Sequence, residues 1–105
     1  MRASGTAWRT TPLHARRFPD GELFLRADDP DALRGAAVAC VMATRNPDAD
    51  VFAALLGAAL ARDLGASSVG VIAPYLPYLR QDDRFHAGEA VTARYVAELL
   101  GLRFD

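Results

Sequence analysis

Apolar residues gather in two short runs on either side of one longer stretch with helical spacing. Residues 36–44 (AAVACVMAT) and residues 67–73 (SSVGVIA) are the two runs. Short apolar runs bounded by loops are typical of strands that are covered on both faces. A strand, a helix and a second strand in this order predict a parallel pair joined by a helix, which is the basic unit of an open α/β sheet.

The stretch between the runs predicts a helix over residues 47–64. Asn46 is expected to cap it, Pro47 to occupy its first position and Gly65 to end it. Apolar residues recur on two adjacent sides of this helix, so we expect a broad apolar face that packs against a sheet or a neighbouring subunit. One side is formed by Val51, Leu55, Ala58, Ala59 and Arg62, and the next by Phe52, Leu56, Ala59 and Leu60.

A hairpin is predicted around residues 13–26. Residues 13–17 (LHARR) and 23–26 (LFLR) have the character of extended segments, and they bracket the turn sequence FPDGE at 18–22. Proline fixes φ in such a turn, aspartate bonds to nearby backbone and glycine permits a positive φ. The following stretch, 27–35, is expected to be a loop with one helical turn from Pro30.

The C-terminal part is expected to hold a second helix and the start of another strand. The helix should begin at residue 91 or 92, with Thr92 or Glu89 as its cap, and end at Gly101. The last residues, LRFD, are typical of a strand that is just beginning.

Composition restricts the class of protein. The chain has 105 residues and a formal net charge of −1, so we expect one domain, 1–105, without attraction to nucleic acid or an anionic membrane. No run approaches the roughly 18 apolar residues of a membrane span, and residues 1–12 lack the apolar stretch of a secretory signal. The single cysteine, Cys40, excludes an internal disulfide framework and is expected to be a small buried hydrophobe. We therefore expect a cytoplasmic protein.

The FPDGE turn offers an aromatic ring beside two carboxylates. Phe18 could stack on a base, and Asp20 and Glu22 could accept hydrogen bonds from its amino group. A plain hairpin turn with one core phenylalanine explains the same residues, and spacing alone favours that interpretation.

The second candidate site is the loop that follows the run at 67–73. It passes through Pro74, Tyr75, Pro77 and Tyr78 and then reads RQDDRF over residues 80–85. Arginine can stack on a base or fork a phosphate, and glutamine can both donate and accept, although neighbouring opposite charges are also found as surface ion pairs worth little. A polar loop after a buried strand is how open α/β sheets present ligand-binding residues. The candidates are Arg80, Gln81, Asp82 and Arg84.

Other chemistry is weakly indicated. The sequence has no glycine-rich phosphate loop, so a nucleotide would be held by side chains. His14 and His86 have no second ligand at metal-binding spacing. No acid–base pair or activated nucleophile is indicated, so we assign no catalytic and no metal-binding residue.

Three segments together resemble the N-terminal domain of the ribose-phosphate pyrophosphokinase family, also called phosphoribosyl pyrophosphate synthetases. They are RRFPDGELFLR (16–26), VIAPYLPYLRQDDRF (71–85) and GEAVTARYVAELL (88–100), in the order and spacing of the family. The resemblance covers about residues 13–105. An F-x-D-G-E turn paired with a P-Y-x-x-Y-x-R-Q-D loop is highly specific.

The resemblance implies a fold and an activity. The fold is α/β, a three-layer, mostly parallel sheet flanked by helices, phosphoribosyltransferase-like (Rossmann-like) and apparently truncated here. The family transfers the β,γ-diphosphoryl group of Mg-ATP to the C1 hydroxyl of ribose 5-phosphate, giving phosphoribosyl pyrophosphate and AMP for nucleotide biosynthesis. Its subunits form homo-oligomers with ATP at the subunit interface, so Mg²⁺ is expected with ATP as co-substrate.

The resemblance also assigns roles to the candidate residues and reverses the preference for a plain turn. Phe18, Asp20 and Glu22 match the turn with which one subunit holds adenine. Arg80 and Gln81 match the loop that its neighbour provides, and the arginine stacks on the base. Asp82 and Arg84 fall in the same family loop.

The chain departs from the family in three places. Asp83 and Phe85 stand where the family is often basic, and the usual first strand and helix are shortened or missing in residues 1–12. The family's ATP-binding histidine, ribose-5-phosphate loop and mobile loop with catalytic lysine and arginine would follow Asp105. We therefore expect that these 105 residues alone are inactive.

Two other functions stay open. A non-catalytic, synthetase-associated homologue would use the apolar helix face and the loop tyrosines in subunit assembly. A phosphoribosyltransferase is less favoured, because its acidic phosphoribosyl-binding loop is not in the sequence.

Overall fold

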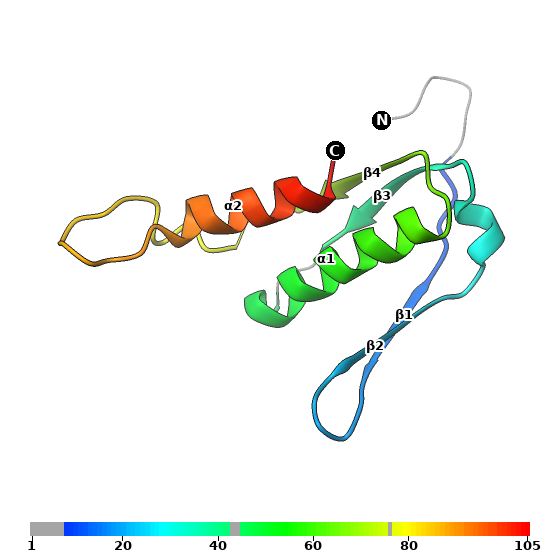
Figure 1. Ribbon diagram of the computed structural model, residues 1–105, viewed down its shortest axis with the longest axis horizontal. Coiled ribbons are helices and arrows are strands. Elements are labelled where there is room, and N and C mark those ends of the chain that lie inside the picture. The colour runs from blue at the N-terminus through cyan, green and yellow to red at the C-terminus, as the bar shows by residue number, and fades with distance from the viewer. Residues whose placement is uncertain (1–7, 43–44, 76) are drawn as a thin grey trace.

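The computed structural model describes residues 8–42, 45–75 and 77–105. It contains two two-stranded sheets and two α-helices (Figure 1). Three parts of the chain lie outside the described residues. They are residues 1–7, the end of the first predicted strand at 43–44, and Leu76 of the loop. None of the helices in the described part of the chain is long and apolar enough to cross a membrane.

The predicted hairpin is confirmed. Strands β1 (Leu13–Arg17) and β2 (Leu23–Ala27) pair antiparallel, with Arg17 opposite Leu23. Gly21 lies in the turn at a φ of +96°, in the region that glycine adopts freely. A short 3-10 helix, Pro30–Leu33, follows the hairpin and confirms the expected helical turn.

The parallel strand–helix–strand unit is also confirmed. Strands β3 (Ala37–Val41) and β4 (Ser68–Ile72) pair parallel with Val38 opposite Val69, and helix α1 (Pro47–Asp63) connects them. Gly65 follows α1 at a φ of +97°, as expected of a C-terminal stop.

The core lies on one face of the parallel pair. Val38 and Cys40 share this face with Val69 and Val71, and both helices pack onto it. The alternate strand residues point the other way, and Val41 and Ile72 are 71% and 51% exposed. Within the described residues only one face of the parallel pair is covered, so the prediction of strands covered on both faces is not confirmed. The buried members of the core are Met42, Val51, Ala58, Ala61, Val69, Leu100 and Phe104.

The predicted helix boundaries and caps need correction. Helix α2 spans Thr92–Arg103, so it continues through Gly101, which has a helical φ and open space around it. Neither Asn46 nor Val91, the residues at the two N-cap positions, makes a side-chain cap bond. At α1 the carboxylate of Asp50 instead accepts from the backbone N–H groups of Arg45 and Asn46, at 2.7 and 3.0 Å.

The end of the chain leaves α2 and approaches β4. Phe104 is extended, and the backbone N–H of Asp105 donates to the carbonyl of Val69 at 2.8 Å. The strand expected at LRFD is not formed in the described residues, because Leu102 and Arg103 still belong to the helix and the last two residues make only this one backbone hydrogen bond with β4. The guanidinium of Arg62 in α1 secures this end through the Arg103 carbonyl and the Asp105 carboxylate, at 2.8 and 3.0 Å.

Candidate functional site

A crevice lies at the carboxyl edge of the parallel pair. Because β3 and β4 run in the same direction, their carboxyl ends share one edge, and the segments that leave these ends border the same space. The crevice has a volume of about 470 Å³. The N-terminus of α1, the loop after β4 and the start of α2 contribute its lining: Asn46, Pro47, Asp48, Tyr78, Arg80, Gln81 and Thr92.

The loop after β4 is fixed at its near end by Tyr78. This residue packs against the core, and its φ of 66° lies in the left-handed region that side chains other than glycine rarely adopt. Such a conformation costs of the order of 1–2 kcal/mol, so it persists only because the packing of the ring holds it. The turn at Tyr78 brings Arg80, two residues later, to the crevice.

The same loop is fixed at its far side by Gln81. The backbone N–H of Ala93 donates to the Gln81 carbonyl at 3.1 Å, and the Thr92 hydroxyl donates to the side-chain Oε1 of Gln81 at 3.1 Å. Both bonds come from the first turn of α2. Arg80 and Gln81 are therefore held between the core and a helix although both are solvent-exposed.

The opposite wall of the crevice is acidic. Asp48 and Asp50 lie in the first turn of α1, where carboxylates offset the positive end of the helix dipole. The Asp50 carboxylate already accepts from the backbone N–H groups of Arg45 and Asn46, which precede the helix. An anionic ligand in this crevice would therefore be attracted mainly by Arg80, and a ligand with amino groups would find acceptors on the α1 side.

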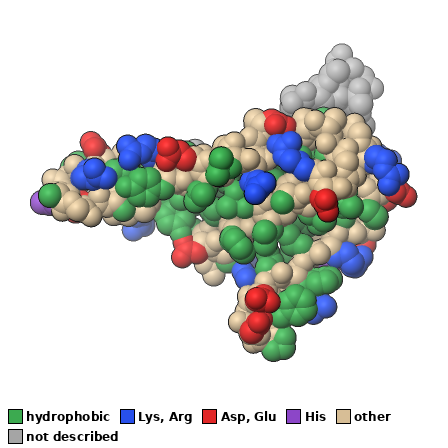
Figure 2. All heavy atoms as spheres, in the orientation of Figure 1, with side chains coloured by type: hydrophobic (Ala, Val, Ile, Leu, Met, Phe, Trp, Pro, Cys, Tyr) green, Lys and Arg blue, Asp and Glu red, His purple; other side chains and the backbone are tan. Residues whose placement is uncertain are grey.

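Asp82 and Arg84 lie further along the projecting loop, where Arg84 closes the loop on itself. The Arg84 guanidinium donates to the Glu89 carbonyl at 2.7 Å and to the Tyr95 hydroxyl at 3.3 Å. A backbone hydrogen bond at Val91, followed by the Arg84 guanidinium, lowers the pKa of Tyr95. Figure 2 shows basic and acidic side chains interspersed along this projection.

The tip of the loop is organised by Glu89, which the sequence suggested as a cap for α2. Its Oε1 accepts from the backbone N–H groups of Phe85 and His86, at 3.2 and 2.9 Å. Its Oε2 lies 3.3 Å from the His86 ring. Glu89 therefore shapes the loop ahead of the helix.

Phe18 at the hairpin tip is supported by two neighbours from the strands. Its ring meets that of Phe24 edge to face at a centroid distance of 5.8 Å, and the Arg16 guanidinium lies 4.4 Å from the Phe24 centroid and 5.5 Å from that of Phe18. Phe18 is nevertheless 40% exposed. The tip thus presents an aromatic ring that is oriented but open to a partner.

The carboxylates of the turn lie beside this ring. Asp20 accepts from the backbone N–H of Glu22 at 3.0 Å, as expected of a local turn bond. Arg17 steadies the turn through the Gly21 carbonyl at 2.9 Å. Figure 2 shows acidic side chains beside hydrophobic ones at the hairpin tip.

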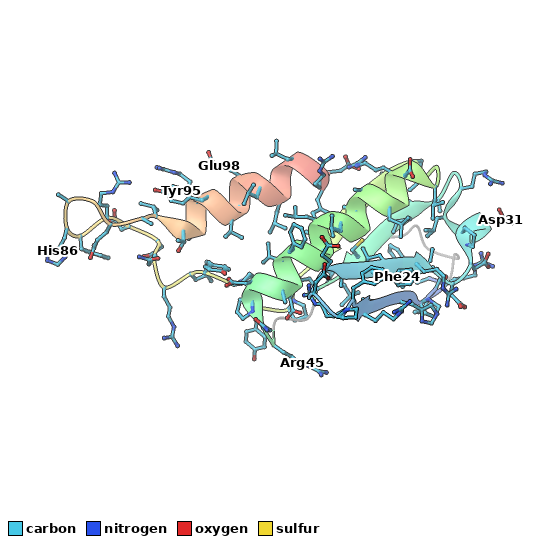
Figure 3. All side chains as sticks on the ribbon, turned by 60° about the horizontal axis from the view of Figure 1, so that its bottom comes forward. Phe24, Asp31, Arg45, His86, Tyr95 and Glu98 are labelled. Atoms are coloured by element: carbon cyan, nitrogen blue, oxygen red, sulfur yellow. The ribbon has the colours of Figure 1, made fainter. Side chains whose placement is uncertain are left out.

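The structure does not bring the two candidate groups together within one chain. The hairpin tip and the loop from Arg80 onward project in different directions from the body in Figure 1, and they remain apart in Figure 3, where Phe24 and His86 mark the two regions. A ligand that contacts both groups would have to lie between two chains.

Five residues of the crevice lining were not predicted as part of a site: Asn46, Pro47, Asp48, Tyr78 and Thr92. Asn46 and Pro47 were interpreted only as a helix start, Thr92 only as a cap, and Tyr78 only as part of a rigid loop. The rule that parallel strands share a carboxyl edge would have placed the start of α1 there. No signal in the sequence indicates the positive φ of Tyr78 or the bond between Thr92 and Gln81.

The described residues contain no group of three or more histidine, cysteine, aspartate or glutamate side chains that could hold a metal ion. Cys40 is partly buried, and burial raises the pKa of its thiol, so it has the character of a core residue.

The fold and crevice define an α/β domain with a polar site at the carboxyl edge of a parallel strand pair. Residues 3–102 match the family described as the N-terminal domain of ribose phosphate pyrophosphokinase. The chain belongs to this family.

Individual relatives agree with this assignment. The ribose-phosphate pyrophosphokinase of Methanobrevibacter smithii is 39% identical over 89 residues, which cover 84% of this chain and 29% of that protein. The enzyme of the same name from Halobacterium salinarum is 37% identical over 103 residues, covering 98% and 36%. A crystal structure of phosphoribosylpyrophosphate synthetase from Mycobacterium smegmatis has a TM-score of 0.81 at 29% identity, covering 90% of this chain and 32% of that one. The chain thus spans about a third of the length of these relatives.

Proposed function

We propose that this chain is the ATP-contacting part of a ribose-phosphate pyrophosphokinase. The complete enzyme would transfer the β,γ-diphosphoryl group of Mg-ATP to the C1 hydroxyl of ribose 5-phosphate, giving phosphoribosyl pyrophosphate and AMP. The observation that carries the proposal is the fixed pair Arg80–Gln81, which lines a crevice at the carboxyl edge of β3 and β4 in a chain of this family.

In this proposal ATP lies between two copies of the protein in a homo-oligomer. Phe18 stacks on the adenine from one side, and Asp20 and Glu22 accept from its amino group. Arg80 and Gln81 of a neighbouring copy contact the base from the other side. What supports the arrangement is that the two groups are separately well organised, lie apart in one chain and offer complementary acceptors and donors.

The remaining loop residues have lesser roles in the proposal. Arg84 shapes the loop through Glu89 and Tyr95, and Asp82 is exposed beside the crevice residues. Because the described residues contain no metal cluster, we assign no metal ligand to them, and Mg²⁺ would arrive bound to the phosphates of ATP. Ribose 5-phosphate and the reacting groups would be held by other parts of the complete enzyme.

We also propose the wider architecture. Residues 1–105 would form a single structural unit at one end of a three-layer, phosphoribosyltransferase-like sheet, with further elements covering the open face that carries Val41 and Ile72. The contact of Asp105 with Val69 is the support for another parallel strand beside β4. A cytoplasmic location fits a protein whose single cysteine packs against the core.

The alternative of a non-catalytic assembly protein has less support from the structure than from the sequence. It relied on a broad apolar face of α1, but Val51 and Ala58 of that face are buried in the chain's own core, and Leu55 packs against it. Of the loop tyrosines, Tyr78 also packs against this core. Phe52 of the helix face and Tyr75 of the loop stay exposed, at 53% and 79%, so the assembly role keeps part of its basis.

Titration of Mg-ATP against the full-length protein and its Arg80→Ala variant tests the proposal. Loss of a charged, stacked arginine is expected to weaken binding about tenfold to a hundredfold. Arg94→Ala is the matched control, because this arginine lies over Tyr95 on α2 and away from the crevice. Equal affinity in the Arg80→Ala variant and the parent protein would remove Arg80 from the site. Turnover by residues 1–105 alone, measured as AMP release with ribose 5-phosphate, would contradict the expectation that this part is inactive.

A mixing experiment tests the position of ATP between copies. Phe18→Ala and Arg80→Ala each damage one half of the proposed site, so each variant alone should bind Mg-ATP weakly. Co-assembled, an intact hairpin from the Arg80→Ala copy can meet an intact loop from the Phe18→Ala copy, and some sites should recover full affinity. Failure of mixed assemblies to recover any affinity would argue against a shared site.

A further inference from the structure

Gln81 is the crevice residue whose chemistry depends on its orientation. Its amide has an acceptor, Oε1, and a donor group, the Nε2 amino group. Oε1 lies 3.1 Å from the Thr92 hydroxyl oxygen. Only the hydroxyl of this pair of oxygens carries a hydrogen, so Thr92 donates and Oε1 accepts with one of its two lone pairs.

From this contact we infer that Thr92 is a positioning residue that orients Gln81 so that its amino group faces the ligand. Thr92 is itself at the crevice, and its backbone neighbour Ala93 fixes the main chain of Gln81 at 3.1 Å. With main chain and Oε1 both held by α2, the donor end of the amide is the end left for a bound molecule. The inference rests on the proposed function and deepens it by assigning a donor role to Gln81.

The orientation defines which ligand atom Gln81 meets. Arg80 offers only donors, and an amino group on Gln81 adds another. The loop side of the crevice is therefore complementary to hydrogen-bond acceptors without a hydrogen, such as a ring nitrogen of a base or a phosphate oxygen. The hairpin carboxylates Asp20 and Glu22 are acceptors and match an exocyclic amino group. A ligand with acceptors on one edge and an amino group on another, as in adenine nucleotides, satisfies both sides.

Three substitutions in the full-length protein test whether binding depends on the orientation of the Gln81 amide and not only on its presence. Thr92→Val keeps the branched shape and removes the hydroxyl, and it is expected to weaken Mg-ATP binding roughly fivefold, the effect of one neutral hydrogen bond. Thr92→Ser keeps the hydroxyl and should bind Mg-ATP with the affinity of the parent protein. Gln81→Glu keeps the acceptor for Thr92 but loses the amino group, so it should weaken binding at least as much as Thr92→Val.

A double-mutant cycle shows whether Thr92 affects Mg-ATP binding through Gln81. If Thr92 acts through Gln81, Thr92→Val should cost nothing further in a Gln81→Ala background, whereas a purely structural role would cost the same in both. Thermal unfolding of each variant shows whether the start of α2 is intact. Side-chain amide NMR signals of Gln81, followed without ATP, should shift in Thr92→Val and stay close to those of the parent protein in Thr92→Ser.

The outcomes distinguish this inference from the proposed function. If Arg80→Ala weakens Mg-ATP binding but Thr92→Val does not, the role of Thr92 is overturned and the ATP site stands. Unchanged affinity in Gln81→Glu would mean that the amide presents its oxygen to the ligand and would also overturn the inference. If the parent protein binds no Mg-ATP, the proposed function fails and this inference fails with it.

Discussion

Gly57 is the position where α1 meets the hairpin, and its substitution by alanine gives a sharp prediction. A Cβ on Gly57 would lie 3.2 Å from Cδ2 of Leu13, the first residue of β1. This is a few tenths of an ångström too close, but Leu13 is 43% exposed and the atom is the end of a flexible side chain. A glycine in a helix interior costs about 1 kcal/mol relative to alanine. A side chain turned about 30° from its rotamer costs about 0.5–1.5 kcal/mol, and the smaller rotation that Leu13 needs costs less.

The gain in helix propensity exceeds the cost of rotating Leu13. Gly57→Ala should therefore raise the free energy of unfolding by about 0.5 kcal/mol, the difference between the two. Urea unfolding of the full-length protein, followed by circular dichroism, measures the change. In a Leu13→Ala background the obstructing atom is gone, and the gain should rise toward about 1 kcal/mol. Gly101→Ala is the control within α2, because no atom lies within 4 Å of the added Cβ. A destabilised Gly57→Ala protein would show that the hairpin cannot yield and would refute this reasoning.

Two further predictions concern titrating groups. The backbone N–H of Val69 and then the Arg62 guanidinium lower the pKa of Asp105, so its stabilising effect is complete above the ordinary aspartate pKa of about 3.9 and is lost as pH falls through the lower folded value. Asp105→Asn should therefore melt below the parent protein at neutral pH and converge with it at strongly acidic pH, and a constant gap in Tm would contradict this. Burial raises the pKa of the Cys40 thiol, so iodoacetamide should alkylate it more slowly than free cysteine at mildly alkaline pH, and an equal rate would contradict its packed position.

Local sequence signals predicted the elements well where the deciding interactions are themselves local. FPDGE specifies a turn through the properties of its own proline, aspartate and glycine, and the structure pairs the strands on either side of it. Pro47 and Gly65 mark the two ends of α1 for the same reason. The failures lie where tertiary contacts decide. Gly101 has the character of a stop, but the packing of Leu100 and Phe104 onto the core carries α2 past it.

Apolar runs also predicted strands without revealing how they are covered. A run such as AAVACVMA is apolar on both sides because alanine is acceptable in either environment, so the pattern does not distinguish one covered face from two. In the described residues the helices take the face of Val38 and Cys40 and leave Val41 open. Crevice residues were predictable where they occur in one short motif, as Arg80 and Gln81 do. Thr92 was not, because its hydroxyl meets Gln81 across 11 positions of sequence.

The separation of the hairpin from the crevice has a physical basis in how each is held. Leu13 seats the hairpin against Gly57 in the middle of α1, whereas Arg80 and Gln81 are fixed by Tyr78 in the core and by the start of α2. The hairpin and the loop are thus attached to different parts of the body. The exposed side chains of each group are already held by ring contacts or hydrogen bonds in the absence of a ligand, and such order lowers the entropy cost of binding. If ATP bridges two copies as proposed, its affinity will depend on protein concentration wherever the copies dissociate, and binding will in turn stabilise the assembly by mass action.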